Sequence, residues 1–75
     1  MGAVKEQDTR SRLLNAAMAL FAERGFVQTT MAAISERAED NIAAVNYHFG
    51  DKRALYVEAL RAAFAEANRV YPVIS

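Results

Sequence analysis

The side chains that could carry out covalent or metal chemistry are few in this chain. It has no cysteine and a single histidine, His48, whereas a metal site needs several ligands that converge on one point. The sequence contains no nucleophile–base pair, no carboxylate dyad and no glycine-rich loop for phosphate. We therefore predict that the chain is not an enzyme and requires no cofactor.

Length and composition indicate one small all-α domain. The chain has 75 residues, 53% of them apolar and 24% charged, and alanine, the best helix former, is common. The net charge is zero, which counts against a nucleic-acid-binding domain because such domains are often strongly basic. Charges of opposite sign can lie on different faces, however, so the local field decides.

The sequence shows no targeting or membrane segment. Its first residues lack the apolar core of a signal peptide. No apolar run approaches the roughly 20 residues that span a bilayer. We expect a cytoplasmic protein without a membrane partner, and the lack of cysteine fits a reducing compartment.

The first third of the chain has a helical period. Residues 1–8 are polar without a period, and we expect a flexible arm there. One apolar face follows, at Leu13, Ala16, Ala17, Leu20 and Phe21. Asp8 or Thr9 would cap the start of this helix, and Gly25 would end it in a left-handed conformation.

Two short helices are expected next. Thr29 or Thr30 would cap the first, over residues 31–38. Asp40 or Asn41 would cap the second, over residues 41–49. Their inward-facing residues are Ile34, Ala38, Val45 and Phe49.

A fourth helix is expected over residues 52–69, with Asp51 as its cap and Pro72 beyond its end. Its two apolar stripes are Leu55, Ala59, Ala62 and Ala63, and Tyr56, Leu60, Phe64 and Ala67. This surface is wider than a half-exposed helix needs. We expect one stripe to pack on the other helices and the second to face a domain that is absent from this chain.

Residues 31–49 have the layout of a helix-turn-helix unit, in which a turn of three or four residues joins two short helices. In such units the second helix, the recognition helix, lies in the major groove of DNA while the first crosses the backbone. The recognition helix would be residues 41–49. Many small helical proteins contain a similar turn, so the pattern alone does not fix the function.

Several motifs together resemble the N-terminal DNA-binding domain of TetR-type transcriptional regulators. The resemblance covers residues 9–60. Its motifs are Thr9-Arg10, Leu13-Leu14, Ala16-Ala17, Leu20-Phe21, Glu23-Arg24-Gly25-Phe26, Thr29-Thr30, Ile34, Ala38, His48-Phe49-Gly50-Asp51-Lys52 and Leu55. The segment 41–50 is similar to the branch of the family that carries an Ala-Val-Asn-Tyr recognition helix.

The resemblance implies a helix-turn-helix domain over residues 9–50 and a fourth helix and tail, residues 51–75, that lead to a missing C-terminal domain. In this family that domain pairs the subunits into a homodimer and binds a small apolar or cationic inducer. Inducer binding spreads the two DNA-binding domains and releases a pseudo-palindromic double-stranded operator. A repressor is therefore implied.

The resemblance also implies which residues read bases. Asn41, Ile42, Ala43 and Ala44 would face base edges at the front of the recognition helix. An adenine is the best partner for Asn41, and the apolar side chains suit thymine methyl groups. The full recognition helix would comprise Asn41, Ile42, Ala43, Ala44, Val45, Asn46, Tyr47, His48 and Phe49.

Other positions match phosphate-contacting positions of the family. Thr29 and Thr30 begin the supporting helix, where free N–H groups suit a phosphate, although both threonines are equally suited to simple capping. Met31 matches a position that reaches a base in some members. Lys52 resembles the family's phosphate-binding lysine, and the alternative is a solvated pair with Arg53.

The end of the recognition helix and the first helix supply the remaining candidates. Asn46 replaces the usual phosphate-contacting tyrosine, and Tyr47 would supply that contact unless it is part of the core. His48 would lie near the DNA backbone or pack against neighbouring residues. Arg10 and Arg12 would reach the DNA backbone, although nearby carboxylates cancel part of their charge.

The turn departs from the family pattern. Members commonly have glycine after the alanine of the turn, whereas this chain has Ala38-Glu39-Asp40. A non-glycine residue at positive φ costs about 1 kcal/mol. Either Asp40 caps the recognition helix and the turn tolerates Glu39, or DNA binding is impaired. The second possibility leaves an alternative function, a helical interaction module with lost or weakened DNA binding.

Overall fold

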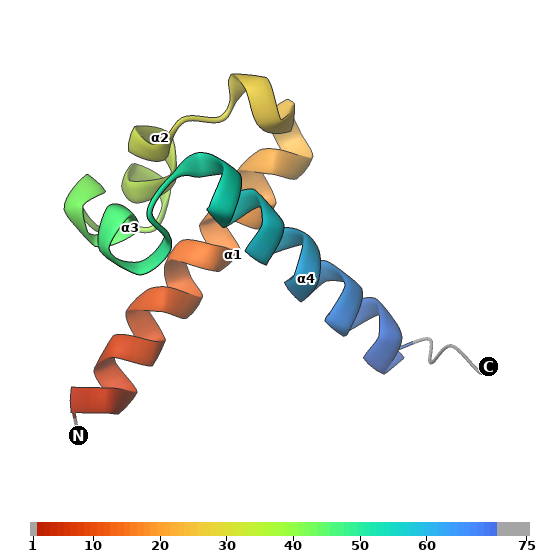
Figure 1. Ribbon diagram of the computed structural model, residues 1–75, viewed down its shortest axis with the longest axis horizontal. Coiled ribbons are helices and arrows are strands. Elements are labelled where there is room, and N and C mark those ends of the chain that lie inside the picture. Colours follow the sequence, from red (N-terminus) through yellow and green to blue (C-terminus); the bar gives the residue numbers. More distant parts are fainter. Residues whose placement is uncertain (1, 71–75) are drawn as a thin grey trace.

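The computed structural model describes the backbone of residues 2–70 and the side chains of residues 8–68. In that part of the chain it shows four helices and no strand: α1 (Gly2–Gln28), α2 (Met31–Arg37), α3 (Ile42–Phe49) and α4 (Lys52–Val70). In Figure 1, α1 and α4 diverge downward from the region where they meet α2 and α3. The predicted all-α class, with a helix-turn-helix unit and a further helix, is confirmed.

The start of α1 differs from the prediction. The backbone is helical from Gly2, so the expected irregular arm over residues 1–8 is wrong where the structure describes it. Asp8 and Thr9 consequently lie inside the helix and do not cap it. The physical reason is that extending a helix costs little once packed residues further along have nucleated it, and residues 3–8 contain no glycine or proline.

The other end of α1 bends sharply at Gly25. This glycine has φ +83° and ψ 171°, outside the helical region, and a short helical stretch continues beyond it to Gln28. The positive φ expected at Gly25 is confirmed, and it explains the residue because side chains are disfavoured in that conformation. Thr29 then donates its hydroxyl to the carbonyl oxygens of Gly25 (2.8 Å) and Leu20 (3.2 Å). The carbonyls freed by the bend thus find a partner.

The core lies where α1, α2, α3 and α4 meet. Each helix contributes buried apolar side chains, and the cluster consists of Leu13, Ala16, Ala17, Leu20, Ile34, Ala38, Val45, Phe49 and Leu55. These include all the inward-facing residues predicted for the two short helices. An aromatic group beside the core joins α1 to α4, with the Tyr56 ring edge-on to Phe21 (4.9 Å between centroids) and Phe26 (5.0 Å).

The turn between α2 and α3 has the hydrogen bonds of a Schellman motif, the common glycine-containing end of a helix. The Glu39 N–H donates to the Glu36 carbonyl (3.1 Å), and the Asp40 N–H donates to the Ser35 carbonyl (2.9 Å). Glu39 occupies the left-handed position, with φ +58°. The turn thus keeps the geometry that glycine favours although glycine is absent.

Replacing Glu39 with glycine is therefore expected to stabilise the domain. Relief of the left-handed strain is worth about 1 kcal/mol, which raises the melting temperature of a domain of this size by about 4–8 °C. Circular dichroism during heating measures the change. Glu36→Gly is the matched control, because Glu36 is exposed and helical, and there glycine should lower the melting temperature. An unchanged or lower melting temperature for Glu39→Gly would contradict the strain.

The caps select among the predicted alternatives. The Thr30 hydroxyl accepts from the Ala33 N–H (3.0 Å), so Thr30 and not Thr29 caps α2. The Asn41 amide oxygen accepts from the Ala44 N–H (2.8 Å) and caps α3. Asp51 accepts from the Ala54 N–H at the start of α4, as predicted.

The two stripes of α4 have different environments. Leu55 and Ala59 are buried against the other helices. On the second stripe Tyr56 is half-buried, but Leu60 is 42% and Phe64 74% exposed. Within the described residues the second stripe therefore packs through Tyr56 alone, and it is exposed from Leu60 onward.

Candidate nucleic-acid interface

One face of α3 is exposed and carries no charge. Its side chains are Ile42, Ala43, Asn46 and Tyr47, and we call them the reading face. The pairs 42 and 46, 43 and 46, and 43 and 47 are three or four positions apart, so each pair lies on the same side of the helix. The opposite side carries Val45 and Phe49, which are buried in the core. The core thus fixes which face of α3 is presented outward.

Tyr47 lies on the exposed side of α3. Its side chain is 75% exposed, so the alternative of a core residue is excluded. The neighbouring His48 is half-buried, with its ring 5.0 Å from the Tyr47 ring and 6.3 Å from the Phe49 ring. His48 therefore packs against its neighbours, which is the alternative given for it.

Asn41 stands at the start of α3 with its amide oxygen engaged in the cap. Its side-chain nitrogen still carries two donors. Bidentate recognition of adenine uses both the oxygen and the nitrogen of an amide. A hydrogen bond from the nitrogen to an acceptor, on a base or a phosphate, is the contact that leaves the cap undisturbed.

Three predicted site residues lie deeper than the reading face. Thr29 is fully buried, and its hydroxyl donates to the end of α1, so the structure does not favour its prediction as a phosphate-contacting side chain. The reason is tertiary, because the bend at Gly25 turns Thr29 inward. Met31 and Ala44 are half-buried and pack against the core. Thr30, by contrast, is exposed.

Lys52 is half-buried at the first position of α4. Its ammonium donates to the Phe26 carbonyl oxygen (2.7 Å) and lies 4.3 Å from the centroid of the Phe26 ring. It thereby ties α4 to the bent end of α1. An ammonium has three donors, so this contact leaves two for a phosphate.

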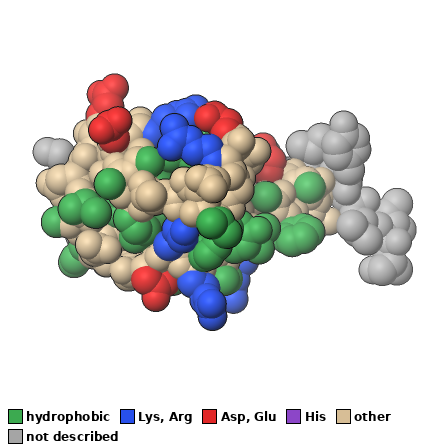
Figure 2. All heavy atoms as spheres, turned by 90° about the horizontal axis from the view of Figure 1, so that it is seen from above, with side chains coloured by type: hydrophobic (Ala, Val, Ile, Leu, Met, Phe, Trp, Pro, Cys, Tyr) green, Lys and Arg blue, Asp and Glu red, His purple; other side chains and the backbone are tan. Residues whose placement is uncertain are grey.

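Arg10 and Arg12, expected to reach the DNA backbone, are engaged within the protein. Arg10 pairs with Glu58 of α4 (3.2 Å), and Arg12 pairs with Asp40 of the turn (3.3 Å). On the face shown in Figure 2, basic and acidic side chains are interspersed and do not form a single basic patch. Arg12 thus places a positive charge beside Asp40, which offsets part of the negative charge of the turn.

Arg53 was not among the predicted site residues. It is exposed on the first turn of α4 and forms no ion pair with another described residue. The signal in the sequence that could have identified it is its place directly after Lys52, two residues beyond the Asp51 cap. Lys52 and Arg53 are thus two adjacent cations, at the third and fourth positions after the end of α3.

Other kinds of site find no support in the described residues. No group of three or more histidine, aspartate or glutamate side chains within residues 8–68 is placed to hold a metal ion. Among the helices of residues 2–70, none is long and apolar enough to cross a bilayer.

Comparison with known proteins identifies the domain. Residues 13–59 match the model of the family described as "Bacterial regulatory proteins, tetR family". The HTH-type transcriptional repressor NicS of Pseudomonas putida is 33% identical over 61 residues, which are 81% of this chain and 29% of that protein. The HTH-type transcriptional dual regulator CecR of Shigella flexneri is 41% identical over 54 residues, 72% of this chain and 24% of that protein.

A third relative is more distant. It is the biofilm operon icaADBC HTH-type negative transcriptional regulator IcaR of Staphylococcus aureus, 26% identical over 61 residues, which are 81% of this chain and 33% of that protein. The chain thus spans between a quarter and a third of the length of these relatives. No solved structure matches it significantly. The family match covers most of the chain and coincides with the four packed helices, and the chain therefore belongs to the TetR family of bacterial transcriptional regulators, of which it contains the helix-turn-helix domain.

Proposed function

We propose that this chain is the DNA-reading domain of a transcriptional repressor and that α3 lies in the major groove of its operator. The observation that carries the proposal is the reading face, which is exposed, uncharged and turned outward by the buried side of the same helix. Ile42 and Ala43 suit thymine methyl groups, and Asn46 suits a polar base edge. Asn41, at the helix start, donates from its free amide nitrogen.

Contacts with phosphate would position α3 in the groove. We assign this role to four residues. They are the exposed Tyr47, Thr30 at the start of α2, and the cations Lys52 and Arg53 on the first turn of α4. We assign no direct DNA contact to three half-buried residues, which are His48, Met31 and Ala44.

The proposal extends to the whole protein. Since the matched segments make up only 24–33% of the relatives, we propose that a C-terminal domain follows, pairs two subunits and binds a small-molecule inducer. Two α3 helices related by a twofold axis would read a pseudo-palindromic operator. The names of the relatives, a repressor, a dual regulator and a negative regulator, favour repression, and the site of action would be the bacterial cytoplasm.

Selection from random duplexes by the intact protein tests this function. We expect enrichment of a sequence with two half-sites about one helical turn apart. Affinity for it should fall with salt, with a slope of log K against log salt of about −3.6, since Lys52 and Arg53 of two subunits neutralise four phosphates.

The competing function, an interaction module without DNA binding, rests on the zero net charge. It predicts that no sequence is enriched and that duplexes bind weakly without preference. The ion pair between Arg12 and Asp40 argues against it, because the arginine offsets the negative charge of one of the two acidic turn residues.

A further inference from the structure

Two arginines of α1, two residues apart, contact opposite ends of α3. Arg12 reaches the turn that precedes α3, and Arg10 reaches the end of α3, with its guanidinium 4.9 Å from the centroid of the Phe49 ring. Arg10 also bonds to Glu58 of α4. Both arginines belong to α1 and connect it to the helix-turn-helix unit through contacts between residues far apart in the chain.

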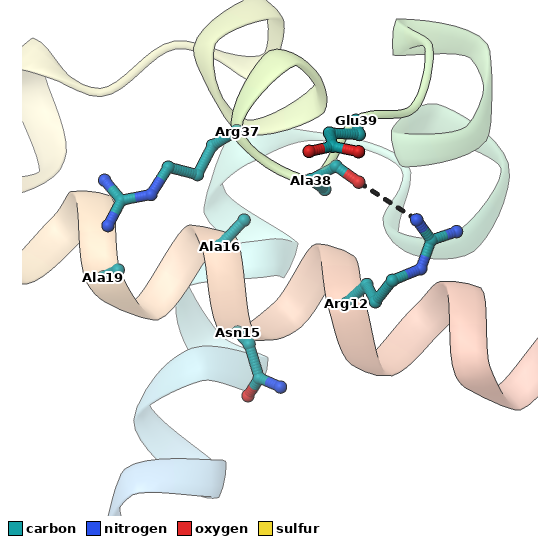
Figure 3. Close-up of a pocket in the computed structure, with 7 residues that line it drawn as sticks. All are labelled: Arg12, Asn15, Ala16, Ala19, Arg37, Ala38 and Glu39. Carbon is teal, nitrogen blue, oxygen red and sulfur yellow. Dashed lines mark hydrogen bonds between the residues drawn. The ribbon is translucent and has the colours of Figure 1, made fainter.

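The Arg12 contacts follow the turn closely. One terminal nitrogen donates to the carbonyl oxygen of Ala38 (3.1 Å), the residue that directly follows α2 and caps its end, as Figure 3 shows. The other donates to Asp40 Oδ2 (3.3 Å). The remaining nitrogen, Nε, lies 3.8 Å from Asp8 of α1. All three guanidinium nitrogens therefore face partners within the chain.

Asp40 connects Arg12 to the start of α3. Its second oxygen, Oδ1, accepts from the N–H of Asn41 (2.9 Å), the cap residue of α3. The Asp40 side chain is only 21% exposed, so loss of Arg12 would leave a largely buried carboxylate without its cation. Between the two contacts stands Glu39, whose left-handed backbone gives the turn no intrinsic preference for this shape.

We propose that Arg12 is a positioning residue for α3 and is not a phosphate ligand: with Asp40 it holds the strained turn and so sets the angle at which the reading face is presented. The inference rests on the proposed DNA-reading function of α3. In this interpretation Asp40 stabilises the turn as the ion-pair partner of Arg12.

A phosphate ligand and a positioning residue differ in their salt dependence. An arginine that neutralises phosphate contributes to affinity for every duplex and to the salt slope. A positioning residue contributes to selective binding alone. We therefore compare Arg12→Ala and Asp40→Ala in the intact protein, measuring affinity for the selected operator and for an unrelated duplex by fluorescence anisotropy across salt concentrations.

The expected result is a loss of about 10-fold for the operator in each variant, with little change for the unrelated duplex and an unchanged salt slope. The double variant Arg12→Asp/Asp40→Arg restores opposite charges but neither the bond to the Ala38 carbonyl nor the bond from the Asn41 N–H, so it should recover only part of the loss. Arg37→Ala is the matched control. Arg37 has nearly the same side-chain exposure (46% against 45%) and pairs with Glu23 of α1 (3.1 Å), but among the described residues its side chain forms no hydrogen bond or ion pair with the turn. It should stay within about 2-fold.

Several results would overturn the inference. A salt slope reduced by about two per dimer, with equal loss for both duplexes, would make Arg12 a phosphate ligand. If the wild type binds selectively and the Arg12→Ala variant has the same affinity for the operator, a positioning role is excluded and the proposed function stands. A wild type without selective binding would overturn both. A double-mutant cycle on the melting temperature, which needs no DNA, then still shows whether Arg12 and Asp40 are coupled.

Discussion

Replacing Ala43 with glutamate is expected to lower affinity for the operator at least about 100-fold, since a like charge placed against phosphate and base edges costs several kcal/mol. Ala43 lies at the centre of the reading face, where the side chains on either side of it are uncharged. Because it is exposed, the new carboxylate meets no core residue, and the fold should be preserved. Titration of the intact protein with labelled operator measures the loss.

The matched control is Ala65→Glu. Ala65 is equally an exposed alanine within a helix, but it lies on α4, beyond the buried Leu55 and Ala59 that anchor that helix. The same change of net charge there should alter operator affinity by no more than about 3-fold, because charges beyond a Debye length of about 10 Å are largely screened. Equal losses in the two variants would refute the assignment of the reading face.

Truncation of Leu55 to alanine should destabilise the domain by about 2–5 kcal/mol. Leu55 is fully buried in the cluster that joins all four helices. A chain of 75 residues has a total stability of only about 4–11 kcal/mol, so the variant loses a large part of it. Urea unfolding followed by circular dichroism measures the loss as a lower midpoint.

Leu60→Ala serves as the control for this prediction. It removes the same atoms from the same helix, but Leu60 is 42% exposed on the second stripe. Its cost should be below about 1 kcal/mol. If Leu60→Ala cost as much as Leu55→Ala in the 75-residue chain, the division of α4 into a packed and an unpacked stripe would be wrong.

Local signals made much of this fold predictable. The caps Thr30, Asn41 and Asp51 each bind an N–H three residues further on, so their partners are fixed by chain geometry alone. The positive φ of Gly25 and the strained position of Glu39 follow from the same short-range rules. The reading face was predictable because the periodicity of α3 separates its buried and exposed sides.

What the sequence did not predict depends on contacts between distant residues. Arg10 finds Glu58 48 positions away, Arg12 finds Ala38 26 positions away, and the Thr29 hydroxyl is enclosed by the bend of α1. None of these partners can be read from spacing. From the sequence alone we predict that all three polar side chains are free to contact DNA. Their partners within the chain become apparent only when the helices pack.

The uncharged reading face has a consequence for how an operator would be found. Long-range attraction to phosphate both accelerates encounter and holds a protein on arbitrary DNA while it slides. Here α3 contributes no such attraction, and Arg10, Arg12 and Arg37 are each matched by a carboxylate. We expect short residence on unrelated sequence and a search dominated by repeated three-dimensional encounters. Fewer molecules would then be sequestered along the chromosome, so that a small number of dimers is enough to occupy the operator.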